Sequence, residues 1–149
     1  MGFLPEEFTP PAPLETHQFR LTLLAPKHCD SDYAAWTSSM DFIRTLPGWA
    51  GSKWPYLMTI EDNLLDCETH LSRSTAGLDF AYTVLLPNRD EVIGCVYFMP
   101  TRPPRAGAVD VRSWVTAEQS ALDKPLHDAV ESWLSDEWPW SDVEYAPRE

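Results

Sequence analysis

Two runs rich in β-forming residues lie close together in the middle of the chain and determine the expected fold. They are Phe80-Ala81-Tyr82-Thr83-Val84-Leu85-Leu86 and Val92-Ile93-Gly94-Cys95-Val96-Tyr97-Phe98-Met99, and Pro87-Asn88-Arg89-Asp90 separates them. Aromatic and β-branched residues favour strands, whereas Pro, Asn and Asp favour turns. The pattern predicts a central β-hairpin.

Outward from this hairpin, strands and helices are expected in a mixed order. Further strands are predicted at 19–24, at 108–115 with Val109, Val111, Ser113 and Val115 on one face, and near 143–145. Helices are predicted from an Asp30 N-cap to Ile43, from a Thr59/Asp62 capping pair to about Gly77, and over a third apolar stripe from Leu126 to Leu134. This order predicts an α+β fold with an α/β/α layered arrangement and a mixed, mostly antiparallel central sheet.

The length of 149 residues predicts a single domain, which we place at 17–149. Four prolines within residues 1–16 predict an extended N-terminal arm without repeating structure. The spacing of the three cysteines is typical neither of a zinc site nor of a disulfide framework. We therefore expect no metal site and three reduced thiols. Neither a basic leader nor about 20 consecutive apolar residues occurs, so a cytoplasmic location is expected.

The formal charge of −12 bears on the partners to be expected. Such a charge repels nucleic-acid backbones and anionic lipid surfaces, so neither a nucleic acid nor a membrane is expected as a partner. The charge favours solubility, and it also leaves open the attraction of a cationic amine.

The order of the elements resembles the core of the GNAT superfamily of N-acetyltransferases. The strand from Glu91 to Tyr97, with an apolar pair followed by Gly94, is similar to the third strand of that family. The Trp138-Pro139-Trp140 motif ahead of the last short strand resembles small GNAT-like proteins. The resemblance implies that acetyl-CoA lies in a gap between the fourth and fifth strands, and that the backbone of Trp114, Val115 and Thr116 pairs with its pantetheine arm.

One loop departs from the family's pattern. The resemblance places the R/Q-x-x-G-x-G/A loop, which binds the pyrophosphate of CoA, at 120–125, and implies cofactor contacts at Leu122, Asp123 and Lys124. Asp123 adds a negative charge there and Pro125 lacks a backbone donor, so a weak anion site is expected, with Lys124 as its one cation. The alternative is that Asp123 caps the following helix, with Pro125 in its first turn.

Several side chains are candidates for chemistry, each with a structural alternative. If they face the gap, Asp110 would act as the base and Tyr145 as the acid. The structural alternatives are that Asp110 is an ordinary strand residue beside Arg112 and that Tyr145 is a packed aromatic side chain. Asp66 and His70, four residues apart and next to Cys67, indicate either a nucleophile system or a surface ion pair beside a buried thiol. A further group could line an acceptor pocket or belong to the core, namely Trp36, Trp49, Trp54 and Tyr56.

Two functions are therefore expected from the sequence. The first is acetyl transfer from acetyl-CoA to a small-molecule amine. The second is a catalytically inactive GNAT-like protein that binds a ligand or partner through its aromatic cleft, with a homodimer as one of its forms.

Overall fold

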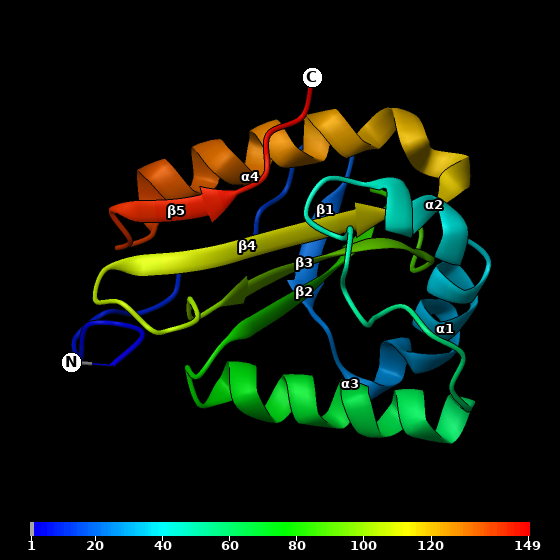
Figure 1. Cartoon of the computed structure of the whole chain (residues 1–149), viewed down its shortest axis with the longest axis horizontal. Coiled ribbons are helices and arrows are strands. Elements are labelled where there is room, and N and C mark those ends of the chain that lie inside the picture. The colour runs from blue at the N-terminus through cyan, green and yellow to red at the C-terminus, as the bar shows by residue number, and fades with distance from the viewer. Residues whose placement is uncertain (1) are drawn as a thin grey trace.

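Five strands form one sheet in the computed structural model, which describes residues 2–149 (Figure 1). In sheet order, which is also chain order, they are β1 (Arg20–Leu23), β2 (Phe80–Leu85), β3 (Val92–Met99), β4 (Ala108–Val115) and β5 (Asp142–Tyr145). Adjacent strands from β1 to β4 are antiparallel to one another, and β5 runs parallel to β4. The predicted α+β class is confirmed, as are the hairpin and the strand over 108–115.

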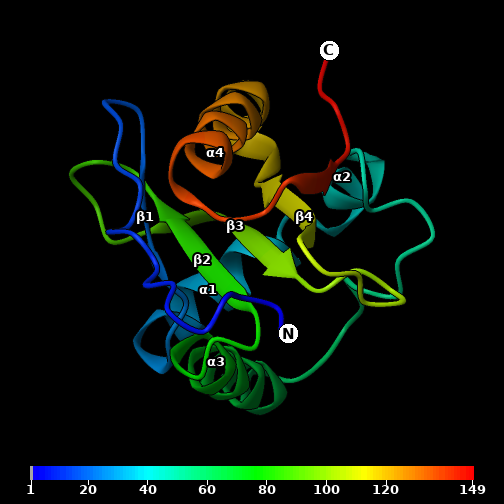
Figure 2. The same cartoon turned by 90° about the vertical axis from the view of Figure 1, so that its left-hand side faces the viewer.

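Helices cover both faces of the sheet, which gives the three layers visible in Figure 2. One side carries α1 (Cys29–Thr37) and α3 (Ile60–Thr75), and the other carries α4 (Asp123–Glu137). Shorter elements are α2 (Met40–Thr45) and the 3₁₀ turns η1 (Pro26–His28) and η2 (Ala117–Leu122). The predicted start of α3 is confirmed, because the Thr59 hydroxyl accepts the Asp62 N–H at 3.1 Å.

The prediction of one continuous helix from an Asp30 cap to Ile43 is wrong. The helix starts at Cys29 with His28 as its N-cap residue, and it breaks at Ser38-Ser39. The Ser38 hydroxyl donates to the Ala35 carbonyl at 2.8 Å, and the Ser39 hydroxyl accepts the Ala117 N–H at 2.9 Å. Such side-chain bonds compete with regular helix geometry, so they favour a break here. The Ser39 bond also connects the start of α2 to the first residue of η2.

Alternation along β4 divides the core into two halves. Val109, Val111 and Val115 pack on the side of α4, whereas Trp114 packs with the residues of α1 and α3. Successive strand side chains point to opposite faces, so the predicted face of Val109, Val111, Ser113 and Val115 is confirmed.

The segment before β1 packs against the closing aromatic residues. The Phe3 ring lies 4.8 Å from Trp140, whose indole N–H donates to the Phe3 carbonyl at 3.0 Å, and Phe8 lies 5.6 Å from Trp138. Because both contacts bury large apolar surface, the segment stabilises the α4 side of the core. No helix within residues 2–149 is both long and apolar enough to cross a bilayer.

A buried carboxylate on α1 should make stability depend on pH. Asp32 accepts a hydrogen bond from the Asn63 side-chain amide at 3.2 Å, and burial raises its pKa to about 6. The unfolded chain releases this proton near pH 4, so the native state loses relative stability as the pH rises from 4 to 6. Asp32→Asn removes this loss, and we expect its stability relative to wild type to increase by about 2–3 kcal/mol between pH 4 and pH 7.

Chemical denaturation of both proteins at the two pH values measures this difference. The matched control is Asp30→Asn, an exposed position on the same helix. Equal pH dependence of Asp32→Asn and wild type would show that Asp32 ionises as an exposed carboxyl does.

Candidate active site

The sheet forks between β4 and β5. Their pairing runs from Ala108 opposite Asp142 to Val111 opposite Tyr145, and after Tyr145 the chain leaves β4 (Figure 1). Backbone polar groups alternate in direction along a strand, and the Thr116 N–H donates to the Ile93 carbonyl on the β3 side at 3.0 Å. Ser113 and Val115 therefore direct their backbone groups toward the fork.

Side chains of this protein fill part of the fork. The Ser113 carbonyl accepts the indole N–H of Trp49 at 2.8 Å and an Arg148 guanidinium N–H at 3.1 Å. Arg148 also donates to the Asp123 carboxylate at 2.9 Å. These side chains are only 3% and 12% exposed, so Arg148 and Asp123 form an ion pair that is largely removed from water.

The expected pyrophosphate loop has a regular structure. Residues 120–122 belong to η2, and Asp123 is the first residue of α4. The N-cap residue is Leu122, without a side-chain bond, so the alternative that Asp123 caps the helix is wrong: its carboxylate is bound to Arg148 instead. Pro125 lies in the first turn as expected. A cavity of about 420 Å³ opens here, lined by Pro47, Ser120, Ala121, Asp123, Lys124, Pro147, Arg148 and Glu149.

Only some of the other expected cofactor contacts lie at the fork or at this cavity. Trp114 and Thr116 direct their backbone groups to β3, so Val115 alone of the three strand residues faces the fork. Leu122 packs against the core, and the Lys124 ammonium pairs with Asp128 at 3.0 Å on the surface. Of the six expected cofactor contacts, Val115 therefore faces the fork, and Asp123 and Lys124 line the cavity beside it.

Tyr145 lies where the strands part. Its hydroxyl shares a hydrogen bond with the Ser113 hydroxyl, and its ring lies 4.2 Å from that of His127. Burial raises the pKa of Tyr145 above its ordinary value, so the phenol keeps its proton throughout the neutral range.

Asp110 lies on the other face of the sheet. It is opposite Glu144 in the β4–β5 register, one position before the Val111–Tyr145 pair, so its side chain points away from that of Tyr145. Its carboxylate lies 3.6 Å from the Arg112 guanidinium. The structure therefore does not bring the two expected catalytic side chains together.

An aromatic pocket opens on the face that carries Asp110. It has a volume of about 190 Å³ and is lined by Trp49, Trp54, Asp66, His70, Tyr97, Met99 and Arg112. The sequence left open whether Asp66 and His70 form a nucleophile system or a surface ion pair. Both line this pocket, where burial lowers the pKa of His70 and its ring lies 5.8 Å from Tyr97. Only the convergence of α3 with β3 and β4 shows that these residues share a pocket.

The remaining members of the expected clusters do not line this pocket. Trp36 is buried with its indole N–H on Asn63 at 3.1 Å, and Tyr56 is 54% exposed. Cys67 is 1% exposed, and burial raises the pKa of its thiol, so it is no nucleophile. Within residues 2–149, His, Cys, Asp and Glu side chains form no cluster able to hold a metal ion.

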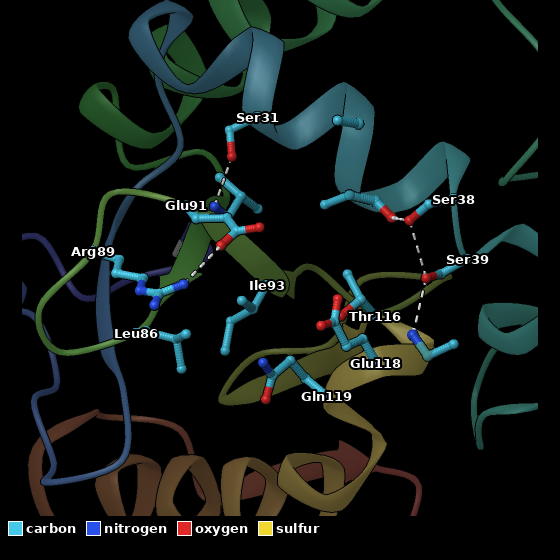
Figure 3. A pocket seen from close by; sticks show the side chains of 14 residues that line it. Ser31, Ser38, Ser39, Leu86, Arg89, Glu91, Ile93, Thr116, Glu118 and Gln119 are labelled. Atoms are coloured by element: carbon cyan, nitrogen blue, oxygen red, sulfur yellow. Dashed lines mark hydrogen bonds and ion pairs between the residues drawn. The ribbon is translucent and has the colours of Figure 1, made fainter.

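A third hollow, of about 380 Å³, lies between α1 and the adjoining ends of β3 and β4 (Figure 3). The Ser31 hydroxyl accepts the Val92 N–H at 2.8 Å, and Arg89 and Glu91 face each other at 3.9 Å. Hydroxyls and charges of both signs line it, and most of them already bind the protein itself. The Ser31–Val92 bond connects α1 to the start of β3.

Comparison with known proteins places this geometry in a known fold. No protein-family model matches the chain, and no curated protein does. A solved structure of a candidate ribosomal-protein-serine acetyltransferase from Vibrio cholerae superposes with a TM-score of 0.71 at 10% identity, over 93% of this chain and 75% of that one.

Two further solved structures agree. RimL, a ribosomal L7/L12 α-N-protein acetyltransferase in complex with coenzyme A, gives a TM-score of 0.66 at 12% identity, over 87% of this chain and 71% of that one. A candidate GNAT-family acetyltransferase from Bordetella pertussis gives 0.54 at 15% identity, over 85% and 73%. The strand fork, the aromatic pocket and the cavity at the start of α4 are therefore features of a chain with the GNAT acetyltransferase fold.

Proposed function

We propose that this protein is an N-acyltransferase that takes acetyl-CoA into the β4–β5 fork and transfers the acetyl group to a small-molecule amine. The observation that carries the proposal is the end of strand pairing at Val111–Tyr145, which leaves the outward backbone of Val115 beyond the paired part of β5. An extended pantetheine arm with amide groups is suited to bind such a strand edge. The solved structure of RimL with coenzyme A has the same fold.

In the proposed reaction, the neutral amine attacks the thioester carbonyl carbon. A C–N bond forms, the C–S bond breaks, the amine loses a proton to a base, and the thiolate gains one. Tyr145, which lies at the fork and keeps its proton, is the proposed acid for the thiolate. Asp110 is the proposed base. Because its side chain lies on the face of the sheet opposite that of Tyr145, it would have to take the amine proton through water from that face, next to the aromatic pocket.

One observation favours the second candidate, an inactive ligand-binding protein. Trp49 and Arg148 both donate hydrogen bonds to the Ser113 carbonyl. The Asp123 carboxylate lies at the start of α4, where the pyrophosphate of CoA would bind. In the enzyme, acetyl-CoA must displace Arg148 from Ser113, and the guanidinium then becomes available to the phosphates. In the inactive protein, the Arg148–Asp123 pair stays closed.

Two measurements separate the candidates. We expect acetyl-CoA at millimolar concentration to raise the melting temperature of wild type, and Asp123→Gly/Pro125→Gly to enlarge the rise, because the internal carboxylate is removed and a backbone donor is restored. No rise in either protein would favour the inactive candidate.

Turnover is followed as amine-dependent release of CoA thiol. We expect Tyr145→Phe to slow it by roughly 10²-fold or more while the acetyl-CoA melting shift stays, because the variant removes only the proton donor. Unchanged turnover in Tyr145→Phe would remove Tyr145 from the mechanism. Tyr33→Phe, a tyrosine of α1 whose hydroxyl donates to the Met58 carbonyl, is the matched control.

A further inference from the structure

The aromatic pocket combines flat apolar walls with two charged groups of opposite sign. Trp49, Trp54 and Tyr97 supply ring surface, and Met99 adds a flexible apolar side chain. Asp66 reaches the pocket from α3, and Arg112 reaches it from β4. The two charges therefore come from separate elements, α3 and β4, and line the same pocket.

The polar groups of the pocket differ in how many hydrogen bonds and ion pairs they already form within the protein. The Tyr97 hydroxyl accepts the Trp114 indole N–H at 3.1 Å. The Arg112 guanidinium lies 5.9 Å from the centre of the Trp49 ring and forms an ion pair with the Asp110 carboxylate at 3.6 Å, which is longer than a hydrogen bond and leaves its N–H donors free for a ligand. Asp66 forms no ion pair with Lys or Arg among residues 2–149. Both charged groups thus keep capacity for a ligand.

Size and charge narrow the ligand. The volume of about 190 Å³ lies below the roughly 300–1,000 Å³ of pockets for drug-sized ligands, so the ligand is small. A plain cation would be attracted by Asp66 and repelled by Arg112, and a plain anion the reverse. A ligand with one positive and one negative group satisfies both, and the aromatic walls favour an apolar side chain.

We propose that the aromatic pocket binds a small α-amino acid with an apolar side chain, its ammonium group at Asp66 and its carboxylate at Arg112. Trp49 links this pocket to the fork, because its ring lines the pocket while its indole N–H donates to the Ser113 carbonyl. The identity of this amino acid as acyl acceptor rests on the proposed function, whereas its binding does not.

Calorimetric titration of the full chain, without acetyl-CoA, tests the binding. The probes are L-phenylalanine and L-leucine, with 2-phenylethylamine and 3-phenylpropionate as analogues of phenylalanine that lack the carboxylate or the ammonium group. We expect at least one amino acid to bind in the millimolar range or tighter, and phenylalanine or leucine to bind roughly tenfold tighter than either analogue, since each lost charged contact costs about one such factor.

Variants at the two charged residues assign the contacts. Asp66→Asn should lower the affinity for the amino acid roughly tenfold without lowering that for 3-phenylpropionate, from which a repelling charge is removed. Arg112→Gln should lower the affinity for the amino acid roughly tenfold without lowering that for 2-phenylethylamine. The matched control is Asp62→Asn, an acidic position one turn earlier on α3 that does not line the pocket. Melting temperatures show that each variant is folded.

Three results would overturn the proposal: neither amino acid binds at millimolar concentration, 2-phenylethylamine binds as tightly as the amino acids, or Asp62→Asn weakens binding as much as Asp66→Asn. Amino acid binding without thiol release would leave this proposal standing and refute the acyltransferase instead. Thiol release with another amine and no amino acid binding would do the opposite.

Discussion

Replacing Arg148 by methionine is expected to lower the free energy of unfolding by about 3–5 kcal/mol, because it leaves the largely buried Asp123 carboxylate without its partner. Arg148 contributes bonds to Asp123 at 2.9 Å, to the Ala146 carbonyl at 2.9 Å and to the Ser113 carbonyl at 3.1 Å, all from a side chain that is 3% exposed. Chemical denaturation measures the loss.

The double variant Arg148→Met/Asp123→Leu provides the control. Removing both charges avoids an unpaired carboxylate, so the double variant should be more stable than Arg148→Met alone, by about 2 kcal/mol. A cost below about 1 kcal/mol for Arg148→Met would mean that the pair behaves as an exposed one, and that Arg148 does not close the fork.

Gly94→Ala is expected to be the second strongly destabilising change, at about 3–4 kcal/mol. A Cβ at this position would lie 2.3 Å from the Trp114 carbonyl oxygen and 3.3 Å from the Val115 Cα, both on the neighbouring strand. Backbone cannot yield as a side chain can, so β3 and β4 would have to separate at the end of β4 that faces the fork. Denaturation measures the loss of stability, and hydrogen exchange of the Thr116 amide, which donates to the Ile93 carbonyl of β3, reports the separation of the strands.

Gly2→Ala is the matched control, since its nearest contact for a Cβ is at 4.0 Å. It should change stability by no more than about 0.5 kcal/mol. Should Gly94→Ala be tolerated equally well, the close approach of β3 and β4 at this position would be wrong.

Local patterns predicted the elements that they determine. The hairpin of β2 and β3, the β4 strand and the Thr59 cap of α3 each depend on residues near one another in sequence, and each is confirmed. The break between α1 and α2 was missed because it depends on Ser39 binding Ala117, which is 78 residues away. Propensity within a helix carries no information on such a contact.

The site shows the same division. The resemblance to the GNAT core, in which the fourth and fifth strands part, placed Tyr145 and Val115 beside the gap, and β4–β5 pairing ends at Tyr145. Neither the pattern nor the resemblance could show that Arg148 pairs with Asp123, or that Asp66, His70 and Arg112 line one pocket, because these arrangements depend on how α4 and α3 pack on the sheet. Sequence reasoning weighed Asp123 only as a cap or a poor phosphate ligand, whereas burial and a guanidinium partner determine its position.

Entry of a thioester's pantetheine arm between β4 and β5 can be followed by acetyl-CoA titration with amide and indole N–H chemical shifts as the readout. The largest changes are expected at the Val115 and Tyr145 amides and at the Trp49 indole N–H, because acetyl-CoA displaces the bond of Trp49 to the Ser113 carbonyl. Changes confined to the aromatic pocket or to the hollow of Figure 3, or no change at millimolar acetyl-CoA, would contradict this mode of entry.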